Sequence, residues 1–251
     1  MDINLVRNEF QRVKALGYIE SNKPFAEKND GMVGNTFEKV VGVDENNLRE
    51  ADWKGWEFKT QRKFSKSASS LFTCKPDFPG GGDQYMRNNW GINDPSGDYP
   101  HIKVFRTSIY AHRWAEVYSK YKMKLEIDDN NKKLKIILCN LDGDIIDDTV
   151  FWTFESLRSA SKKLKNTLVL KAEESLIDGK VHFKYVSANA YINFDFKKLI
   201  ELIRVGKARY DNRLGIYRSG KNIGKEHNHG GGIRLVSSSS YKDLFENYIE
   251  C

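Results

Sequence analysis

The chain has 251 residues, enough for one large domain or two lobes with a shared core, and its 39% hydrophobic content excludes a disordered protein. The charged N-terminus and the lack of a long apolar run lead us to expect neither a secretory signal nor a membrane span. Three widely separated cysteines form no disulfide framework or zinc site, so we expect a cytoplasmic protein. The formal net charge of +7 favours a polyanionic partner, because phosphate contacts release condensed counterions.

The N-terminal quarter of the chain predicts two helices and then two strands. Asp2 can cap a first helix that ends near Gly17, and GMVGNTFEKVVGV predicts a second helix that ends at Gly42. A strand is expected to carry Glu57, and SKSASSLFTCKP predicts a neighbouring strand that ends at Pro76.

The middle of the chain begins with a stretch that is rich in Gly, Asp, Asn and Pro. We expect residues 77–117 to be largely loop, and QYMRNNWG within it suits contact with a nucleic-acid backbone or an ordinary long loop equally well. Beyond it we expect a β-hairpin at 123–138, a helix capped by Thr153, strands at 167–174 and 181–186, and helices at 196–205 and 241–249. This order predicts an α/β fold with a mixed central sheet flanked by helices.

The stretch ADWKGWEFKTQRK brings together groups that suit metal-assisted hydrolysis. Glu57 and Lys59 are two residues apart and share one face of a strand, while Asp52 comes from the preceding turn. Two carboxylates beside an ammonium group suit a hard cation such as Mg²⁺, which polarises a phosphodiester and lowers the pKa of a bound water. The spacing Asp52-x4-Glu57-x-Lys59 resembles the PD-(D/E)xK nuclease signature. A solvated edge strand with an ion pair is the alternative.

Glu38 lies on the second predicted helix, just upstream of Asp52. It is either a supporting acid near the metal or a surface carboxylate of that helix.

The segment from Arg209 to Leu235 is dense in charged residues and glycines, so we expect it to lie outside the core. Its arginines can each present a planar fork to guanine O6 and N7, and each such contact discriminates by about 1–3 kcal/mol per base pair. Asp211 can accept from cytosine N4, and lysines suit phosphates. The candidate DNA-recognition residues are Asp211, Arg213, Arg218, Lys221, Lys225, His227, His229 and Arg234.

Other interpretations of this segment are open to different degrees. GIYRSGKN nearly matches a phosphate-binding loop, but Asn222 replaces the hydroxyl that would hold Mg²⁺. His227 and His229 could bind a metal, although no third ligand stands nearby in the sequence. A solvated basic loop fits the composition as well as base recognition does.

Both informative stretches together resemble the MvaI/BcnI family of type II restriction endonucleases, relatives of the mismatch-repair nickase MutH, with the closer likeness to the MvaI branch. The resemblance is colinear over most of the chain. It is carried by GMVGNTFEKVVGVDENNL, DWKGWEFKT, LFTCKP, YMRNNWG, VFWTFESL, YVSAN and RLGIYRSGKNIGKEHNHG followed by IRL.

The resemblance implies a Mg²⁺-dependent monomer with one or two metal ions and two lobes around double-stranded DNA. By it, Asp52, Glu57 and Lys59 are catalytic, with Asp52 and Glu57 holding the metal, in a PD-(D/E)xK core within residues 1–190. Residues 191–251 would mainly read DNA, with a contribution from 77–117. A DNA methyltransferase would accompany the enzyme.

The family cuts pseudosymmetric CCNGG-type sites. Members with C or G at the centre carry a histidine in the segment that matches LFTCKP, whereas this chain has Thr73 and Cys74, which favours CCWGG. One active site would then nick the two strands in turn. A MutH-like strand-nicking enzyme and a non-catalytic DNA-binding protein are the alternatives.

Overall fold

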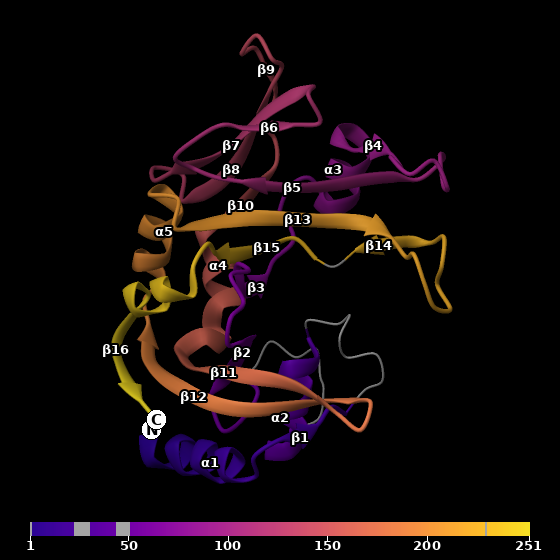
Figure 1. Cartoon of the computed structure of the whole chain (residues 1–251). Helices are drawn as coiled ribbons and strands as arrows, with labels where there is room; N and C mark the ends of the chain where they lie inside the picture. The colour runs from indigo at the N-terminus through magenta and orange to yellow at the C-terminus, as the bar shows by residue number, and fades with distance from the viewer. Residues whose placement is uncertain (1, 23–30, 44–50, 229) are drawn as a thin grey trace. The chain divides into compact units, whose positions relative to one another are not determined.

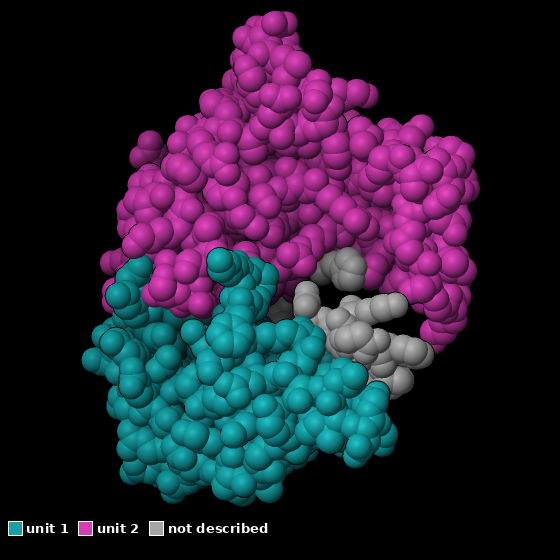
Figure 2. Space-filling model, viewed as in Figure 1, with its two compact units in different colours: residues 1–67, 162–195, 241–251 teal, residues 68–161, 196–240 magenta. Residues whose placement is uncertain are grey.

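The protein folds into two compact units, each assembled from separate stretches of the chain. The structure, a computed structural model, describes residues 2–22, 31–43, 51–228 and 230–251 (Figure 1). Unit 1 comprises residues 1–67, 162–195 and 241–251, and unit 2 comprises 68–161 and 196–240 (Figure 2). The units are therefore interleaved along the sequence, whereas the two expected lobes were consecutive ranges.

Unit 1 is built on a five-stranded mixed sheet of order β1-β12-β11-β2, with β16 also pairing with β12. The strands are β1 (Ile19–Glu20), β2 (Glu57–Arg62), β11 (Asn166–Ile177), β12 (Lys180–Phe194) and β16 (Phe245–Glu250). β2 and β11 run parallel, with Glu57 opposite Thr167, and the other pairs are antiparallel. The mixed sheet predicted from the sequence is confirmed.

Two helices complete the core of unit 1, as predicted. In α1 (Ile3–Ala15), Asp2 accepts a hydrogen bond from the Asn4 backbone N–H at 2.9 Å, and α2 (Met32–Val41) ends at Gly42 with φ 84°. The apolar faces of both helices are buried against the sheet (Figure 1). Glycine ends α2 because this left-handed conformation costs it little.

Unit 2 contains two further sheets. The six-stranded sheet has the order β3-β15-β13-β5-β4, with β14 also pairing with β13, and the five-stranded sheet has the order β10-β8-β7-β6, with β9 pairing with β8. The first comprises β3 (Ser69–Thr73), β4 (Ile92–Asn93), β5 (Lys103–Ile109), β13 (Ala208–Ile216), β14 (Glu226–Asn228) and β15 (Gly232–Leu235). The second comprises β6 (Ala115–Val117), β7 (Tyr121–Asp128), β8 (Lys133–Cys139), β9 (Ile145–Asp147) and β10 (Phe151–Thr153).

The helices of unit 2 confirm two predictions. The Thr153 hydroxyl accepts from the Ser156 backbone N–H at 3.2 Å and so caps α4 (Phe154–Ser161), and α5 (Phe196–Arg204) lies where the apolar spacing places it. The largely loop-like structure expected for 77–117 is wrong, because this range holds α3 (Gly82–Trp90) and three strands. Met86 and Trp90 bury the apolar side of α3, and the flanking glycines and asparagines hid this pattern.

The helix expected at 241–249 is also wrong. A 3₁₀-helix, η3 (Ser238–Asp243), is followed by β16. Phe245 and Tyr248 both contact the ring of Tyr191 on β12, with centroids 5.4 and 5.7 Å away. Pairing with β12 therefore overrides the local helical spacing.

None of the helices in the part of the chain that the structure describes is long and apolar enough to cross a membrane.

Replacing Phe37 by Ala should lower the free energy of unfolding by about 3–5 kcal/mol, because Phe37 is fully buried and its ring centroid lies 5.0 Å from those of both Phe58 and Tyr185. Urea unfolding followed by circular dichroism measures this change. Phe64→Ala is the matched control, since Phe64 is 84% exposed and should change stability by less than about 0.5 kcal/mol. Equal effects of the two substitutions would contradict this core assignment.

Candidate functional site

The first residue of β2, Glu57, is a carboxylate held between two lysines. Glu57 is 1% exposed, and its Oε1 lies 2.7 Å from Lys59 Nζ and 2.8 Å from Lys163 Nζ. The predicted shared face of Glu57 and Lys59 is confirmed by this contact. Glu57 Oε2 is buried and has no hydrogen-bond partner among the described residues. A buried, unpartnered carboxylate oxygen is costly, so a bound cation would stabilise it.

Asp52 joins this carboxylate through the turn that precedes β2. Lys54 and Gly55 adopt φ angles of 46° and 83°, and the chain bends there as expected. Asp52 Oδ2 accepts the Phe58 backbone N–H at 2.7 Å, which fixes the carboxylate at the start of the strand. Burial, reinforced by the Glu57 charge, raises the pKa of Asp52 above its ordinary value. A second carboxylate nearby is what a site for a cation requires.

Lys163 is a member of this site that the sequence reasoning missed. It lies in η2 (Lys162–Lys165), the 3₁₀-helix that leads into β11. Because β11 pairs in parallel with β2, η2 reaches the start of β2, where Glu57 stands. The run KKLK before an apolar strand was the available signal, but only strand pairing identifies which lysine contacts Glu57.

The donor set at β2 fits a hard divalent cation. Asp52 and Glu57 supply only oxygen ligands, and none of the described residues donates a hydrogen bond to Glu57 Oε2. No group of three or more His, Cys, Asp or Glu within the described ranges is arranged to hold a metal. Mg²⁺ needs only one or two carboxylates, because it keeps several of its waters.

Glu38 occupies a half-buried position on α2. The phenol of Tyr185 donates to the Val33 carbonyl at 2.7 Å, and burial, with the Glu38 charge as the second cause, raises the pKa of that phenol. Glu38 thus lies beside Tyr185, close to the aromatic cluster that packs against Phe58.

Four of the eight predicted recognition residues lie on one sheet of unit 2: Asp211 and Arg213 on β13, His227 on β14 and Arg234 on β15. Asp211, 4% exposed, lies at the middle of β13, and its Oδ1 accepts from Ser108 Oγ at 2.7 Å and from Arg209 Nε at 2.8 Å. Arg234 Nε and Arg213 Nη2 lie 3.4 and 3.7 Å from Asp211 Oδ2. Three guanidinium groups therefore surround a single carboxylate.

The expectation that residues 209–235 lie outside the core is wrong for β13. This strand runs between β5 and β15, and alternate residues such as Tyr210 and Leu214 are 1% exposed. Its arginines project on the other face of the strand. Because successive residues of a strand face opposite sides of the sheet, β13 can bury apolar side chains on one side and present charged side chains on the other. Overall composition does not reveal this alternation.

The charged face of this sheet is hollowed. A hollow of about 660 Å³ is lined by Arg106, Thr107, Ser108, Arg209, Asp211, Asn212 and Arg213.

Two buried side chains of α3, Asp83 and Arg87, bind β14. Arg87, 2% exposed, pairs with Glu226 and donates to the His227 carbonyl at 3.0 Å, and Asn228 Nδ2 donates to Asp83 at 2.9 Å. The His227 ring stacks on Tyr217 with centroids 3.8 Å apart. α3, expected as loop, is therefore the support of the His227 strand.

The other predicted recognition residues are placed differently. Arg218 pairs with Asp94 and Asp98 and holds the pKa of Asp94 well below its usual range. Lys221 and Lys225 are exposed in the turn between β13 and β14. His229 lies outside the described residues.

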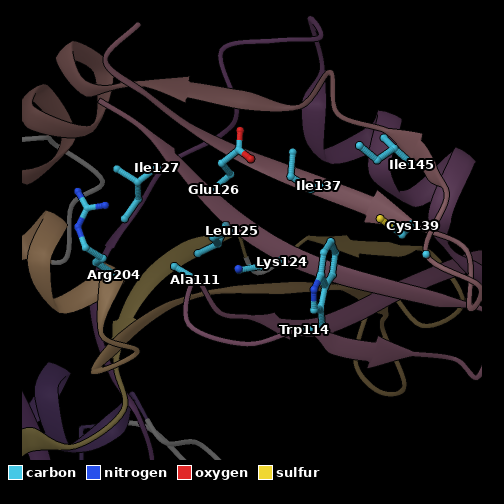
Figure 3. Close-up of a pocket in the computed structure, with 11 residues that line it drawn as sticks. Ala111, Trp114, Lys124, Leu125, Glu126, Ile127, Ile137, Cys139, Ile145 and Arg204 are labelled. Carbon is cyan, nitrogen blue, oxygen red and sulfur yellow. The ribbon is translucent and has the colours of Figure 1, made fainter. Parts of the chain in front are cut away.

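A second pocket, of about 400 Å³, opens over the sheet of β7 and β8, where Trp114, Leu125 and Ile137 line it (Figure 3). None of the predicted site residues borders it.

A mixed α/β fold with a carboxylate–lysine strand end and a separate arginine-lined sheet has the features of a site-specific endonuclease. Comparison with known proteins makes the class more specific. The sequence model of the MvaI/BcnI restriction endonuclease family matches residues 7–245. The chain therefore belongs to this family and is a type II site-specific endonuclease.

Solved structures of a relative agree. The structure described as the restriction endonuclease MvaI–cognate DNA substrate complex is 29% identical over 100% of this chain and 99% of that chain, with a TM-score of 0.89. MvaI in the absence of DNA is 29% identical over 100% and 98% of the two chains, with a TM-score of 0.61. No curated protein matches the sequence.

Replacing Asp211 by Asn should destabilise unit 2 by about 1.5–3 kcal/mol, because charge-assisted hydrogen bonds are lost and the arginines around it repel each other unopposed. Urea unfolding measures the change. Asp98→Asn is the control, since Asp98 pairs with Arg218 at the surface and should contribute less than about 1 kcal/mol. A stable Asp211→Asn protein would show that this carboxylate does not hold the cluster together.

Proposed function

We propose that the protein hydrolyses both strands of double-stranded DNA at CCNGG-type sites, with CCWGG favoured, in a Mg²⁺-dependent reaction. The observation that carries the catalytic part is the buried Glu57 carboxylate: two lysines hold its Oε1, and its Oε2 has no partner among the described residues. The charge of Glu57 also acts on Asp52.

Asp52 and Glu57 would hold one or two Mg²⁺ ions. When bound, Mg²⁺ would polarise the phosphodiester and lower the pKa of a bound water. Lys59 projects from the same strand face as Glu57, so its ammonium group can orient the attacking water or stabilise the charge that develops on the phosphate. Glu38 would act from α2 as a supporting acid near the metal.

Lys163 adds a second ammonium group to the site. Its contact with Glu57 Oε1 matches that of Lys59, and its charge also acts on Asp52. We assign it a positioning role, in which it turns Glu57 so that Oε2 faces the metal and helps to draw the phosphate towards the site.

DNA reading belongs to unit 2 in this proposal. Arg213 and Arg234 would present guanidinium forks to guanines, Asp211 would accept from cytosine, and His227 would complete the pattern. His229 joins them by family resemblance, while Lys221 and Lys225 would contact phosphates. Arg218 would act through its ion pairs with Asp94 and Asp98, by shaping the turn that follows β13.

The division of labour therefore follows the compact units rather than a boundary at residue 190. Residues 68–161 would belong to unit 2 and take part in DNA recognition, and residues 241–251 would belong to unit 1, which would carry out cleavage.

The central base pair would be A·T or T·A. Thr73 ends β3, which pairs with β15 in the six-stranded sheet of unit 2, called the recognition sheet below. Its side chain is exposed, and a threonine methyl group suits contact with the methyl group of thymine. A histidine, which accompanies C or G centres in the family, is not at this position.

One catalytic site in a monomer would cut two strands by nicking, reorienting on the pseudosymmetric site and nicking again. Because so short a site recurs often in any genome, a companion DNA methyltransferase would protect the host DNA, and both proteins would act in the cytoplasm.

Lys59→Ala should keep specific DNA binding and lose cleavage, because the ammonium group acts on the reaction rather than on recognition. The measurement is a plasmid digest by wild type with Mg²⁺, by wild type with EDTA, and by the variant with Mg²⁺, followed by sequencing of the ends. Discrete linear fragments from wild type alone are expected, and their ends identify the central base.

Each other result of this digest has its own meaning. Relaxed circles without linear DNA would indicate a MutH-like nickase. Cleavage by Lys59→Ala at the wild-type rate would remove Lys59 from the catalytic set. A protein that binds DNA equally with and without Mg²⁺ and never cuts would overturn the hydrolytic proposal.

Lys163→Met should lower both the turnover number and the Mg²⁺ concentration for half-maximal cleavage, the latter by roughly tenfold, because one cationic charge that repels the metal is lost. A magnesium titration of cleavage measures both quantities. Lys165→Met, in the same 3₁₀-helix, is exposed and should leave both unchanged. Lower activity with an unaltered magnesium dependence would indicate that Lys163 has only a structural role.

A further inference from the structure

Arg106 is an arginine of the recognition sheet that the sequence motifs do not single out. It lies on β5 directly opposite Arg213 of β13. Like charges directly opposite each other in a sheet are destabilising. The pair borders the hollow on this face of the sheet, where an electron-rich ligand would offset the repulsion between the two guanidinium groups.

The side chain of Arg106 lies across β13 above Gly215. A methyl group added to Gly215 would overlap Arg106 Nη2 and stand 3.0 Å from its Cζ and Nε. Gly215 does not have a positive φ, so the backbone itself does not demand glycine. The missing side chain instead makes room for the guanidinium group.

This position brings the guanidinium group close to His227, because Gly215 pairs with His227 across β13 and β14. Burial, with the charges of Arg106 and Arg87 as further causes, lowers the pKa of His227. Within the described parts of the chain, the Arg106 guanidinium has neither an ion pair nor a hydrogen bond, in contrast to Arg209 and Arg218. Its donors are therefore available to a ligand.

We propose that Arg106 is a specificity-determining residue that donates to O6 and N7 of a guanine in the recognition site, and that Gly215 exists to let it reach that base. This inference rests on the proposed function, in which the face of β5, β13 and β15 reads the major groove. Arginine is suited to this contact because its planar fork matches the two acceptors of guanine.

The surroundings favour a base edge over a phosphate. A phosphate offers only acceptors, so it would give the nearby Asp211 carboxylate no donor. Base edges offer donors as well as acceptors. Asp211 and the neutral ring of His227 can accept from them, while Arg106 and Arg213 donate.

The test measures DNA binding by Arg106→Ala, Gly215→Ala and the double variant, all in a Lys59→Ala background so that the DNA stays intact. Titrations use the cognate duplex, duplexes with each base pair of the site exchanged, and a random duplex, at several salt concentrations. Arg106→Ala should weaken cognate binding by roughly 5- to 150-fold and relax discrimination at one G·C pair, with an unchanged salt slope.

Gly215→Ala should reproduce this loss, since the added methyl group displaces the guanidinium group, and the double variant should bind no worse than Arg106→Ala alone. Arg158→Ala, which removes an arginine from α4 in the same unit, should leave specificity unchanged. Circular dichroism of each variant controls for folding.

Several results would overturn the inference. Uniform weakening on all duplexes with a salt slope smaller by about one would identify a phosphate contact. Additive losses in the double variant, or unchanged specificity of Arg106→Ala, would show that Gly215 and Arg106 do not act together on a base. The proposed function fails separately, and only if the background protein itself shows no preference for the cognate duplex over the random duplex.

Discussion

The parallel pairing of β2 with β11 is the constraint on which the rest of the structure depends. Two parallel neighbours in a sheet need a crossover connection, and in this chain the connection runs from the end of β2 to η2 and contains most of unit 2. When the chain returns, η2 brings Lys163 to Glu57. The candidate site at β2 is therefore completed by a residue that follows most of unit 2 in the sequence.

The two candidate sites use the same electrostatic arrangement. In each, a single buried carboxylate is surrounded by cationic side chains: Glu57 by two lysines, and Asp211 by three arginines. A buried ion cluster stabilises a fold weakly, because desolvation offsets much of the attraction. Such clusters are better understood as a way to hold charged groups at defined positions. At Glu57, the Oε2 atom that no lysine contacts favours binding of a cation. At Asp211, the excess of guanidinium groups favours binding of an electron-rich surface.

Rigid elements support the groups proposed to contact DNA. Asp211 and Arg213 lie on the central strand of a sheet, and the His227 strand is tied to α3 through the buried Asp83 and Arg87. Side chains on such supports lose little conformational freedom when they bind, which favours discrimination between similar sequences. The buried guanidinium group of Arg87 contacts a carbonyl and a carboxylate of β14, which ties this strand to α3.

The helices α1, α2 and α5, the hairpin of β7 and β8, and the grouping of Asp52, Glu57 and Lys59 at β2 could be predicted from the sequence, because each rests on local spacing. Asp52, Glu57 and Lys59 lie within eight residues of one another, so a turn and one strand bring them together without help from the rest of the chain. The family, too, is encoded in segments that keep their order.

Features that depend on pairing between distant segments could not be predicted from the sequence and are visible only in the folded protein. The tertiary structure made residues 245–250 a strand through contacts with Tyr191, and it placed β13 between two neighbours although its composition resembles a surface loop. It also brought Lys163 to Glu57, and Arg106 over Gly215. The physical reason is the same in each case: a strand obtains its partners, and a charged side chain its neighbours, from across the sheet, and no local pattern records which segment lies there.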